Sequence, residues 1–421
     1  MNNSKSRRVF IKTSAASLFL PGALMGSCKN VSMEDAIDYS ALDRILKRPV
    51  LKRDLFSGPV IIEYLELLHF DGNFICKVRA ENGAIGLSVS NSRMTSLYPI
   101  FIHQLRPFFI GRDARNLDDL LDEVYVHKLN YKYQGIALWI PLATIEFAIL
   151  DMLGRIAGTP MCQLLGDQHH SKIAVYRANN NRGLSAKESL ETILTTVQES
   201  GARALKFKVG GRMSRNRDYP PGRTEELIPL LRKEFGNEMT IYADSNGSYD
   251  VPEAVRIGKI LQRYNIDFFE EPVPFDWYEE TREVKQQLDI PVAGGEQEPS
   301  MHNFRWLIAN DGLDIVQPDI FYFGGMIRSL KVARMAETMG KLCTPHISGS
   351  GLGYLYMMQF VSILPNAGPY HEFKGFNPKI PLNCDTSDLT VQNGKVSVPS
   401  GPGSGIEIDT NYMKRYKLVT T

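Results

Sequence analysis

The chain has 421 residues, with 48 lysines and arginines against 47 aspartates and glutamates and a formal net charge of +1. This length suits about two domains, or one large barrel with an accessory piece, and the balanced charge excludes the strong field that would favour nucleic acid or an anionic membrane surface. The five cysteines are scattered without CxxC spacing, so neither a disulfide framework nor a zinc site is indicated, and no apolar run has the length needed to span a bilayer.

The first 28 residues have the composition of a targeting segment. Arg7 and Arg8 precede Phe10 and a short apolar region, an order that resembles a twin-arginine export signal. We therefore expect residues 1–28 to be such a signal and the protein to be exported to the periplasm. The sequence Met-Gly-Ser-Cys ending at Cys28 also resembles a lipoprotein cleavage site, which leaves a lipid anchor at Cys28 as an open alternative.

Residues 45–165 predict a small α+β domain. The stretches PVIIEYLELL, from residue 59, and FICKVRAENGAIGLS, from residue 74, are typical of strands, with a hairpin turn at Asn82-Gly83. Residues 95–165 then show apolar residues at helical spacing and end at a Gly-Thr-Pro stop. Strands followed by a run of helices indicate an α+β domain.

Residues 170–374 change to short apolar strands that alternate with helical stretches. Such alternation predicts parallel strands joined by crossover helices, and eight units favour a closed (β/α) barrel over an open sheet. The strand candidates are KIAVYRA, ALKFKVG, TIYADSN, IDFFEEP, IPVAGGE, DIVQPD, KLCTPH and GPYHEF. Residues 375–421 lose the pattern, and VQNGKVSVPSGPGSGIEI, from residue 391, predicts a hairpin that returns to the first domain.

Ionisable residues recur at nearly equal intervals where these strands end. Intervals of 26 or 27 residues separate the members of two series, Asp244, Glu270, Glu296 and Asp319, His346, Glu372. Each interval is about one strand-helix unit, so every strand would deliver its polar residue to the same barrel face, where such barrels carry their chemistry. A single acid after a strand is more often a helix N-cap, but capping does not account for six residues in the same phase.

Three of these residues predict a metal site. Asp244, Glu270 and Glu296 end successive strands, and three close carboxylates repel one another unless a cation compensates them. An all-oxygen, highly charged site suits Mg²⁺ better than zinc or copper. The alternative is a structural network of carboxylates paired with arginines, but these strands place no arginine beside them.

The remaining residues predict acid–base chemistry. Lys206 and Lys208 lie one residue apart in a strand and point to the same side, either at a solvent-facing edge or in a site that holds negative charge. Nearby positive charge would favour a neutral Lys208 amine, which could remove a proton. Asp319 could orient the His346 imidazole as a second acid or base. A base, a metal and an opposed acid suit abstraction of the proton next to a carboxylate, with Glu372, if protonated, donating a hydrogen bond.

The motifs KFK, DSN, EEP, GGE, QPD and TPH together resemble the enolase superfamily, in particular its mandelate racemase-like subgroup. The resemblance implies a modified TIM (β/α)7β barrel over residues 170–374, capped by the α+β domain of residues 45–165 together with the tail of residues 375–421. It implies a homo-oligomer, a small carboxylate substrate and a lysine or histidine base with Mg²⁺. By position it makes Asp244, Glu270 and Glu296 the Mg²⁺ ligands, Lys208 and the His346–Asp319 pair the opposed acid–base groups, Lys206 the contact to the substrate carboxylate and Glu372 a stabilising acid. Asn246 would lie beside the metal, and Glu271 would not itself be a ligand.

The resemblance also narrows the reaction. The dipeptide epimerase, succinylbenzoate synthase and cycloisomerase branches carry a lysine at the end of the sixth strand, where this chain has Asp319, so those activities are disfavoured. The reaction it implies is dehydration of an acid sugar, a hexonate or aldarate, to a 2-keto-3-deoxy acid. Two alternatives stay open: a racemase or epimerase of an α-hydroxy acid, and a non-catalytic binder of carboxylated sugars. Residues 81–99 are one candidate region for substrate contacts. The arginines that follow the lysine strand are another, and a solvated basic loop is the alternative for them. These arginines are Arg212, Arg215, Arg217 and Arg223.

Overall fold

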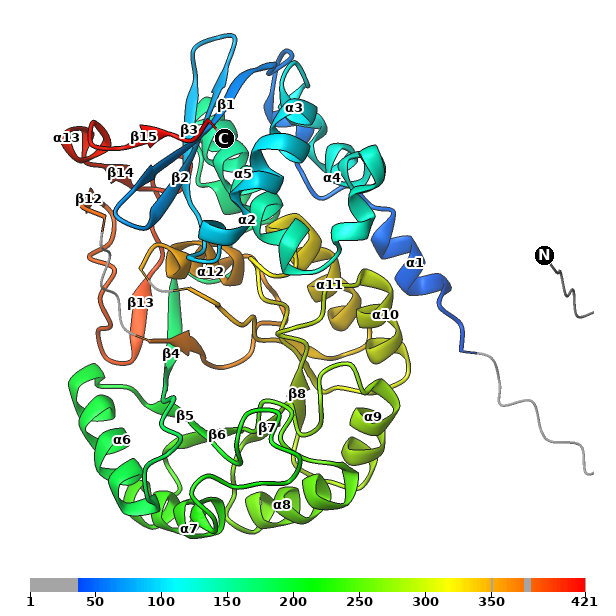
Figure 1. Ribbon diagram of the computed structural model, residues 1–421, viewed down its shortest axis with the longest axis vertical. Helices are drawn as coiled ribbons and strands as arrows, with labels where there is room; N and C mark the ends of the chain where they lie inside the picture. The colour runs from blue at the N-terminus through cyan, green and yellow to red at the C-terminus, as the bar shows by residue number, and fades with distance from the viewer. Residues whose placement is uncertain (1–36, 350, 375–379, 421) are drawn as a thin grey trace, which may run out of the picture. The chain divides into compact units, whose positions relative to one another are not determined.

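The computed structural model describes residues 37–349, 351–374 and 380–420, and the predicted export signal, including Cys28, lies outside these residues. Within them, eight parallel strands curl into a barrel wall in the order β10-β9-β8-β7-β6-β5-β4-β11, with helices on the outside (Figure 1). The wall closes through a parallel bridge from Cys343 to Ala367, just before β11. The predicted (β/α)7β barrel is therefore confirmed, and every strand candidate contains the strand expected of it. The strands are β4 Lys172–Ala178, β5 Ala204–Lys208, β6 Thr240–Asp244, β7 Phe268–Glu270, β8 Val292–Gly294, β9 Ile315–Val316, β10 Leu342–Cys343 and β11 His371–Phe373.

In the described part of the chain, a helix follows each of the first seven barrel strands. Local sequence fixes where several of them begin: Ser185 and Glu188 form a reciprocal capping box at the first, and the Asp250 side chain accepts from Glu253 N at the third. The helices are α6 Ala186–Ser200, α7 Arg223–Phe235, α8 Val251–Arg263, α9 Tyr278–Gln286, α10 Met301–Ala309, α11 Met326–Thr338 and α12 Gly353–Ser362.

The two faces of the barrel wall carry different side chains. In β5, Leu205 and Phe207 pack outward among the helices, whereas Ala204 faces the barrel interior with Tyr176 and Tyr242. Since side chains alternate along a strand, Lys206 and Lys208 share the inward side with Ala204. Aromatic rings pack beside them in the barrel interior, with Tyr176 edge-on to Tyr242 and Tyr242 stacked on Phe268, and Lys206 is 1% exposed.

An antiparallel sheet with helices forms the second part of the described chain. We call it the first sheet, because its strands β1 to β3 come first in the sequence. The hairpin turn predicted at Asn82-Gly83 is present, with Gly83 at φ 87° and Ala84 N donating to Asn82 Oδ1 at 3.1 Å. The strands are β1 Ile62–Phe70, β2 Asn73–Ala80 and β3 Ile85–Val89. The helices are α1 Ser40–Leu46, α2 Met94–Ile100, α3 Arg106–Phe109, α4 Leu117–Val126 and α5 Ile136–Ala157, with short 3-10 or π-helical turns η1 Arg53–Leu55, η2 Phe101–Leu105, η3 Ala114–Asn116, η4 His127–Tyr133 and η5 Met161–Leu164.

Helix α5 corrects one expectation from the sequence. It is 22 residues long and apolar enough to cross a membrane by length and composition, although no such run was expected. However, 89% of its most apolar window is buried inside the protein, which is typical of a core helix. Its apolar sequence is broken by Glu146 and Asp151, and both are buried.

The C-terminal tail contacts both parts of the described chain. Instead of one hairpin over residues 391–408, a tight turn at Asn393-Gly394 leads into β13 Lys395–Ser397, which pairs antiparallel with β4 of the barrel. The later strand β14 Glu407–Ile408 pairs with β12 Leu382–Asn383. After α13 Thr410–Met413, β15 Lys417–Leu418 extends the first sheet beside β1.

Glu146 joins α5 to the barrel. Its Oε1 accepts a hydrogen bond from Ile327 N at 2.8 Å, at the start of α11, and a Cβ on Gly325 would overlap its Oε2. Burial raises the pKa of this carboxyl to about 8, which outweighs the opposing effect of the backbone donor. Glu146 is therefore a buried acid that keeps its proton at neutral pH.

This buried acid makes stability depend on pH. In the folded state Glu146 holds its proton up to about pH 8, whereas in the unfolded chain it loses it near the usual glutamate pKa of about 4.3. Raising the pH between these values therefore destabilises the fold, by up to ~1.4 kcal/mol per pH unit. We expect the Tm of Glu146→Gln to rise relative to the wild-type Tm between pH 5 and 8, and not above. Thermal melts of both proteins across this pH range check the prediction, with the exposed Glu238→Gln variant as control. A Tm difference that does not change with pH would contradict it.

Candidate active site

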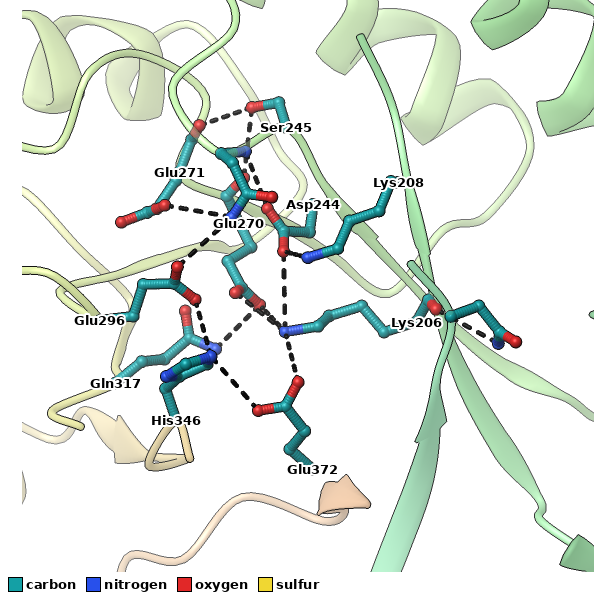
Figure 2. A network of polar contacts seen from close by, with 12 residues as sticks. Lys206, Lys208, Asp244, Ser245, Glu270, Glu271, Glu296, Gln317, His346 and Glu372 are labelled. Carbon is teal, nitrogen blue, oxygen red and sulfur yellow. Dashed lines mark hydrogen bonds and ion pairs between the residues drawn. The ribbon is translucent and has the colours of Figure 1, made fainter. Parts of the chain in front are cut away.

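The predicted polar residues gather at the carboxyl ends of the barrel strands (Figure 2). Asp244 and Glu270 are the last residues of β6 and β7, and Glu296 follows β8 by two residues. Each pair of neighbouring strands is in parallel register, with Asp244 beside both Lys208 and Glu270. The register therefore places these side chains at one level, as the regular spacing in the sequence predicted.

Asp244, Glu270 and Glu296 form a compact carboxylate cluster. One ligand oxygen from each lies within 4.8 Å of the others, and the three residues are 0%, 0% and 3% exposed. Burial raises the pKa of Glu270 to about 7, since desolvation and its acidic neighbours outweigh the attraction of Lys206. Such a cluster is costly to bury without positive charge at its centre.

The two lysines of β5 contact this cluster. Lys206 Nζ lies 2.9 and 2.8 Å from the two carboxylate oxygens of Glu270 and 3.8 Å from Glu372 Oε1. Lys208 Nζ donates to Asp244 Oδ2. Lys208 lies on the wall of the cavity described below, whereas Lys206 is buried beneath it. The solvent-edge alternative for the Lys-Phe-Lys stretch is therefore wrong.

His346 lies across the carboxylate cluster from Lys208 (Figure 2). Its Nδ1 lies 2.7 Å from Asp319 Oδ2, and its Nε2 lies 3.3 Å from Glu296 Oε2. Asp319 is itself fixed, because its Oδ1 accepts from the backbone N–H groups of Phe321 and Tyr322 at 2.8 and 2.9 Å. Desolvation opposes the charged imidazole, but the charges of Glu296 and Glu372 prevail and raise the pKa of His346 to about 9. The predicted Asp–His pair is thus assembled, with Nε2 directed at the cluster.

Glu372 departs from expectation in its charge. Burial disfavours its ionised form, but Lys206, Lys374 and His346 outweigh burial and hold the pKa of this carboxyl well below its usual range. Its Oε2 accepts from Ile347 N at 3.3 Å, and Lys374 Nζ lies 3.4 Å from its Oε1. The hydrogen bond considered for a protonated Glu372 is therefore disfavoured by this arrangement of charges, since cations surround the carboxylate.

Three neighbouring residues support the cluster. Asn246 Nδ2 lies 3.4 Å from Glu296 Oε1, beside the predicted metal position, and Glu271 is buried with its Oε2 3.5 Å from the same nitrogen. Gln317 Nε2 donates to Glu270 Oε2 at 3.0 Å. Sequence reasoning assigned Gln317 no role, although it lies two residues before Asp319 and just past the end of β9.

A cavity of about 720 Å³ opens above the cluster. Lys208, His346 and Glu372 form part of its wall, together with Asp71–Asn73 and Val89–Arg93 from the first sheet and the segment after it. The predicted contact region of residues 81–99 therefore contributes its middle part, residues 89–93, whereas the hairpin at Asp71-Gly72 was not predicted. Most of the wall is polar, with serine, asparagine and arginine side chains.

The arginines predicted to contact substrate are only partly in place. Arg212 lies on the cavity wall, but Arg215 and Arg217 do not. Arg223 is buried instead, where its Nη1 donates to Lys208 O at 2.7 Å and fixes the strand end. Sequence reasoning missed Arg182, which also lies on the cavity wall.

The carboxylate cluster fits a divalent cation. Its donors are hard oxygens, as Mg²⁺ prefers, and all three converge from successive strands. In this structure the two lysines supply the opposing charge. The residues that would hold a metal are therefore Asp244, Glu270 and Glu296.

Two family models match the chain. "Enolase C-terminal domain-like" covers residues 188–412, and "Mandelate racemase / muconate lactonizing enzyme, N-terminal domain" covers residues 72–166. The chain belongs to the mandelate racemase/muconate lactonizing enzyme family of the enolase superfamily. The fold and the family resemblance inferred from the sequence are confirmed, and this enolase-superfamily chain is an enzyme of a family with dehydratase, racemase and isomerase members.

Similar proteins carry several activities. The chain is 26% identical over 316 residues to an arabinonate dehydratase of Saccharolobus solfataricus, covering 74% of this chain and 81% of that protein. It is also 26% identical over 326 residues to a D-galactarolactone cycloisomerase of Agrobacterium fabrum, covering 74% and 82%. Because a cycloisomerase is among the similar proteins, Asp319 alone does not exclude a cycloisomerase activity. Membership of the enolase superfamily leaves the reaction class open.

Solved structures share the fold of this enolase-superfamily chain. A Roseobacter denitrificans protein described as a candidate racemase is 31% identical, with a TM-score of 0.79 over 85% of this chain and 99% of that one. A mandelate racemase/muconate lactonizing protein of Paracoccus denitrificans in complex with magnesium is 25% identical, with a TM-score of 0.76 over 86% and 99%. The similarity therefore covers both parts of the described chain.

Proposed function

We propose that the protein is a Mg²⁺-dependent dehydratase that converts an acid sugar to a 2-keto-3-deoxy acid. The observation that carries this proposal is the placement of Lys208 and His346 on opposite sides of three buried carboxylates (Figure 2). The Nδ1 of His346 lies 2.7 Å from Asp319 Oδ2. The polar cavity above them suits a hydroxyl-rich ligand. The arabinonate dehydratase among the similar proteins supports the same reaction class.

Different residues of the chain would carry out the proton transfers of this reaction. Lys208 or His346 would take the proton from the carbon next to the substrate carboxylate, giving an enediolate. Asp319 holds His346 Nδ1, so Nε2 is the atom that would deliver a proton to the departing β-hydroxyl, which leaves as water. The resulting enol becomes the keto acid when the β-carbon gains a proton and the enol oxygen loses its own. Mg²⁺, when bound by Asp244, Glu270 and Glu296, would supply the positive charge that stabilises the enediolate.

A racemase or epimerase is the second candidate, favoured by one observation. Bases on both sides of a carbon can remove a proton from one face and return it to the other, and the Roseobacter protein described as a candidate racemase is 31% identical. The two reactions differ in the fate of the β-hydroxyl. A non-catalytic sugar binder is the third reading, and the complete set of acid–base residues argues against it.

A substrate screen tests the proposal. The purified enzyme with Mg²⁺ is incubated with pentonates, hexonates and aldarates, and the products are assayed for 2-keto-3-deoxy acids, with His346→Asn as the inactive control. A dehydratase accumulates such a product from at least one acid sugar. Exchange of the α-proton with solvent deuterium, or inversion, without any keto acid would instead establish the racemase reading. Binding without either reaction would establish the binder.

Export to the periplasm, lipidation of Cys28 and assembly into a homo-oligomer stay predictions. N-terminal sequencing and lipid labelling of the mature protein decide the first two. Light scattering of the purified protein decides the third.

A further inference from the structure

Two arginines converge on one neutral oxygen at the cavity wall. Arg182 Nη1 and Arg212 Nη2 lie 3.0 and 3.1 Å from Asn246 Oδ1. Arg182 lies between β4 and α6, and Arg212 lies four residues after Lys208 at the end of β5. Both line the cavity above the carboxylate cluster. The Asn246 amide therefore links this pair to the active site, because its nitrogen lies 3.4 Å from Glu296.

The two arginines differ in how their donors are used. The remaining nitrogens of Arg182 are directed to backbone carbonyls, including Gly210 O at 3.0 Å and Val209 O at 3.4 Å. Among the described residues the Arg212 side chain donates to Asn246 Oδ1 alone, and it is exposed on the cavity wall. Arg182 therefore acts as part of the frame, and Arg212 is the member that can offer free donors to a ligand.

The pair lacks a compensating anion. Within the described residues neither guanidinium lies within 4.0 Å of a carboxylate, the limit for an ion pair. The carboxylate of Asp244 is engaged by Lys208. Two like charges held together on a neutral amide are stabilised when an anion binds between or beside them.

Other charges on the cavity wall also favour an anionic ligand. Arg93 adds a third guanidinium, whereas Lys374 is paired with Glu372 at 3.4 Å, and Asp71 is the one acid of the described wall besides Glu296 and Glu372. The guanidinium groups on the described wall, those of Arg93, Arg182 and Arg212, therefore outnumber its remaining acid, Asp71. A substrate with a single carboxylate, used at the reacting end, would leave this charge unmatched.

We propose that Arg212, held by Asn246 beside Arg182, binds a second anionic group of the substrate, so that the preferred substrates are sugar diacids. This inference rests on the proposed function, because it assigns another part of the same cavity, the wall beside Asn246. Arg182 and Asn246 are positioning residues in this arrangement. Arg212 is the residue that sets specificity, since its guanidinium can bind a carboxylate through two parallel hydrogen bonds.

Matched pairs of substrates test the inference. Galactarate is compared with galactonate, and glucarate with gluconate, for the wild type and for Arg212→Ala, in kcat/KM and in affinity measured by calorimetry with Mg²⁺ present. The wild type should favour each diacid. Arg212→Ala should lose about 10- to 100-fold in kcat/KM on the diacid, as expected for one charge-assisted contact, and less than about threefold on the monoacid. The control is Arg215→Ala, an exposed arginine on the same loop that does not line the cavity.

The outcomes separate this inference from the proposed function. Equal handling of diacid and monoacid by the wild type, or an equal loss on both in Arg212→Ala, would overturn the second anionic subsite while leaving the dehydratase intact. Binding of diacids without turnover would support the subsite and overturn the dehydratase. Absence of both binding and turnover for all four sugars would overturn both.

Discussion

Lys208→Ala is expected to lower kcat by about 10²- to 10⁴-fold, the usual contribution of a positioned general base. The physical reason is that Lys208 is the amine on the cavity wall facing His346 across the carboxylate cluster. Removing it should leave Mg²⁺ affinity equal or higher, because Lys208 otherwise competes with a cation for Asp244 Oδ2. Turnover of the substrate found in the screen measures the first effect, and Mg²⁺-dependent stabilisation measures the second.

Lys259→Ala is the matched control, because Lys259 is exposed on α8, outside the cavity. It should change neither kcat nor Mg²⁺ binding. If Lys208→Ala keeps turnover within about threefold of wild type, Lys208 is not the base. If Lys208→Ala instead loses Mg²⁺ binding, the contact of Lys208 with Asp244 positions the carboxylate cluster. The assignment of Lys208 as the base then fails, because the loss of turnover follows from the loss of the metal.

Removing divalent cations with a chelator is expected to abolish turnover and lower the Tm. Three buried carboxylates within 4.8 Å repel one another, and a bound ion removes that repulsion in the folded state only. At a Mg²⁺ concentration of about 100 times Kd, binding adds ~2.7 kcal/mol to the free energy of unfolding. Returning Mg²⁺ should restore both activity and Tm, and melts at increasing Mg²⁺ measure the affinity.

Glu296→Gln is the ligand variant best suited to this test. Its partner His346 keeps the contact with Asp319, whereas a change at Glu270 would leave Lys206 buried without its closest anion. The variant should lose most of the Mg²⁺-dependent rise in Tm, and the exposed Glu283→Gln on α9 should keep it. A Mg²⁺ response that is unchanged in Glu296→Gln would exclude this residue as a ligand.

Much of the site could be predicted because the barrel repeats one unit. Each strand-helix unit has nearly the same length, so equal spacing in the sequence becomes a ring of side chains at one level, as with Asp244 and Glu270. The alternation of Lys206 and Lys208 with Leu205 and Phe207 was also readable, because a strand has a strict period of two.

What the sequence could not predict depends on long-range packing and on summed charge. The ionised state of Glu372 follows from Lys206 on β5 and from His346 after β10, which are distant in the sequence, together with Lys374 just past the end of its own strand. The place of Arg182 in the cavity follows from contacts with Asn246, 64 residues away. The apolar helix α5 could not be assigned from length alone, since only its neighbours distinguish a core helix from a membrane span.

The pairing of β15 with β1 has a consequence for how the protein is made. Leu68 lies opposite Leu418, and Ser404 N donates to Asp151 Oδ1 at 2.7 Å, so the first sheet and its central helix are completed by residues at the far end of the chain. While the ribosome is still translating, these partners do not yet exist. The early segment must therefore wait until residues 404–418 have been synthesised before this strand can be added, and a nascent chain stalled before residue 404 would leave the Asp151 carboxylate without this donor.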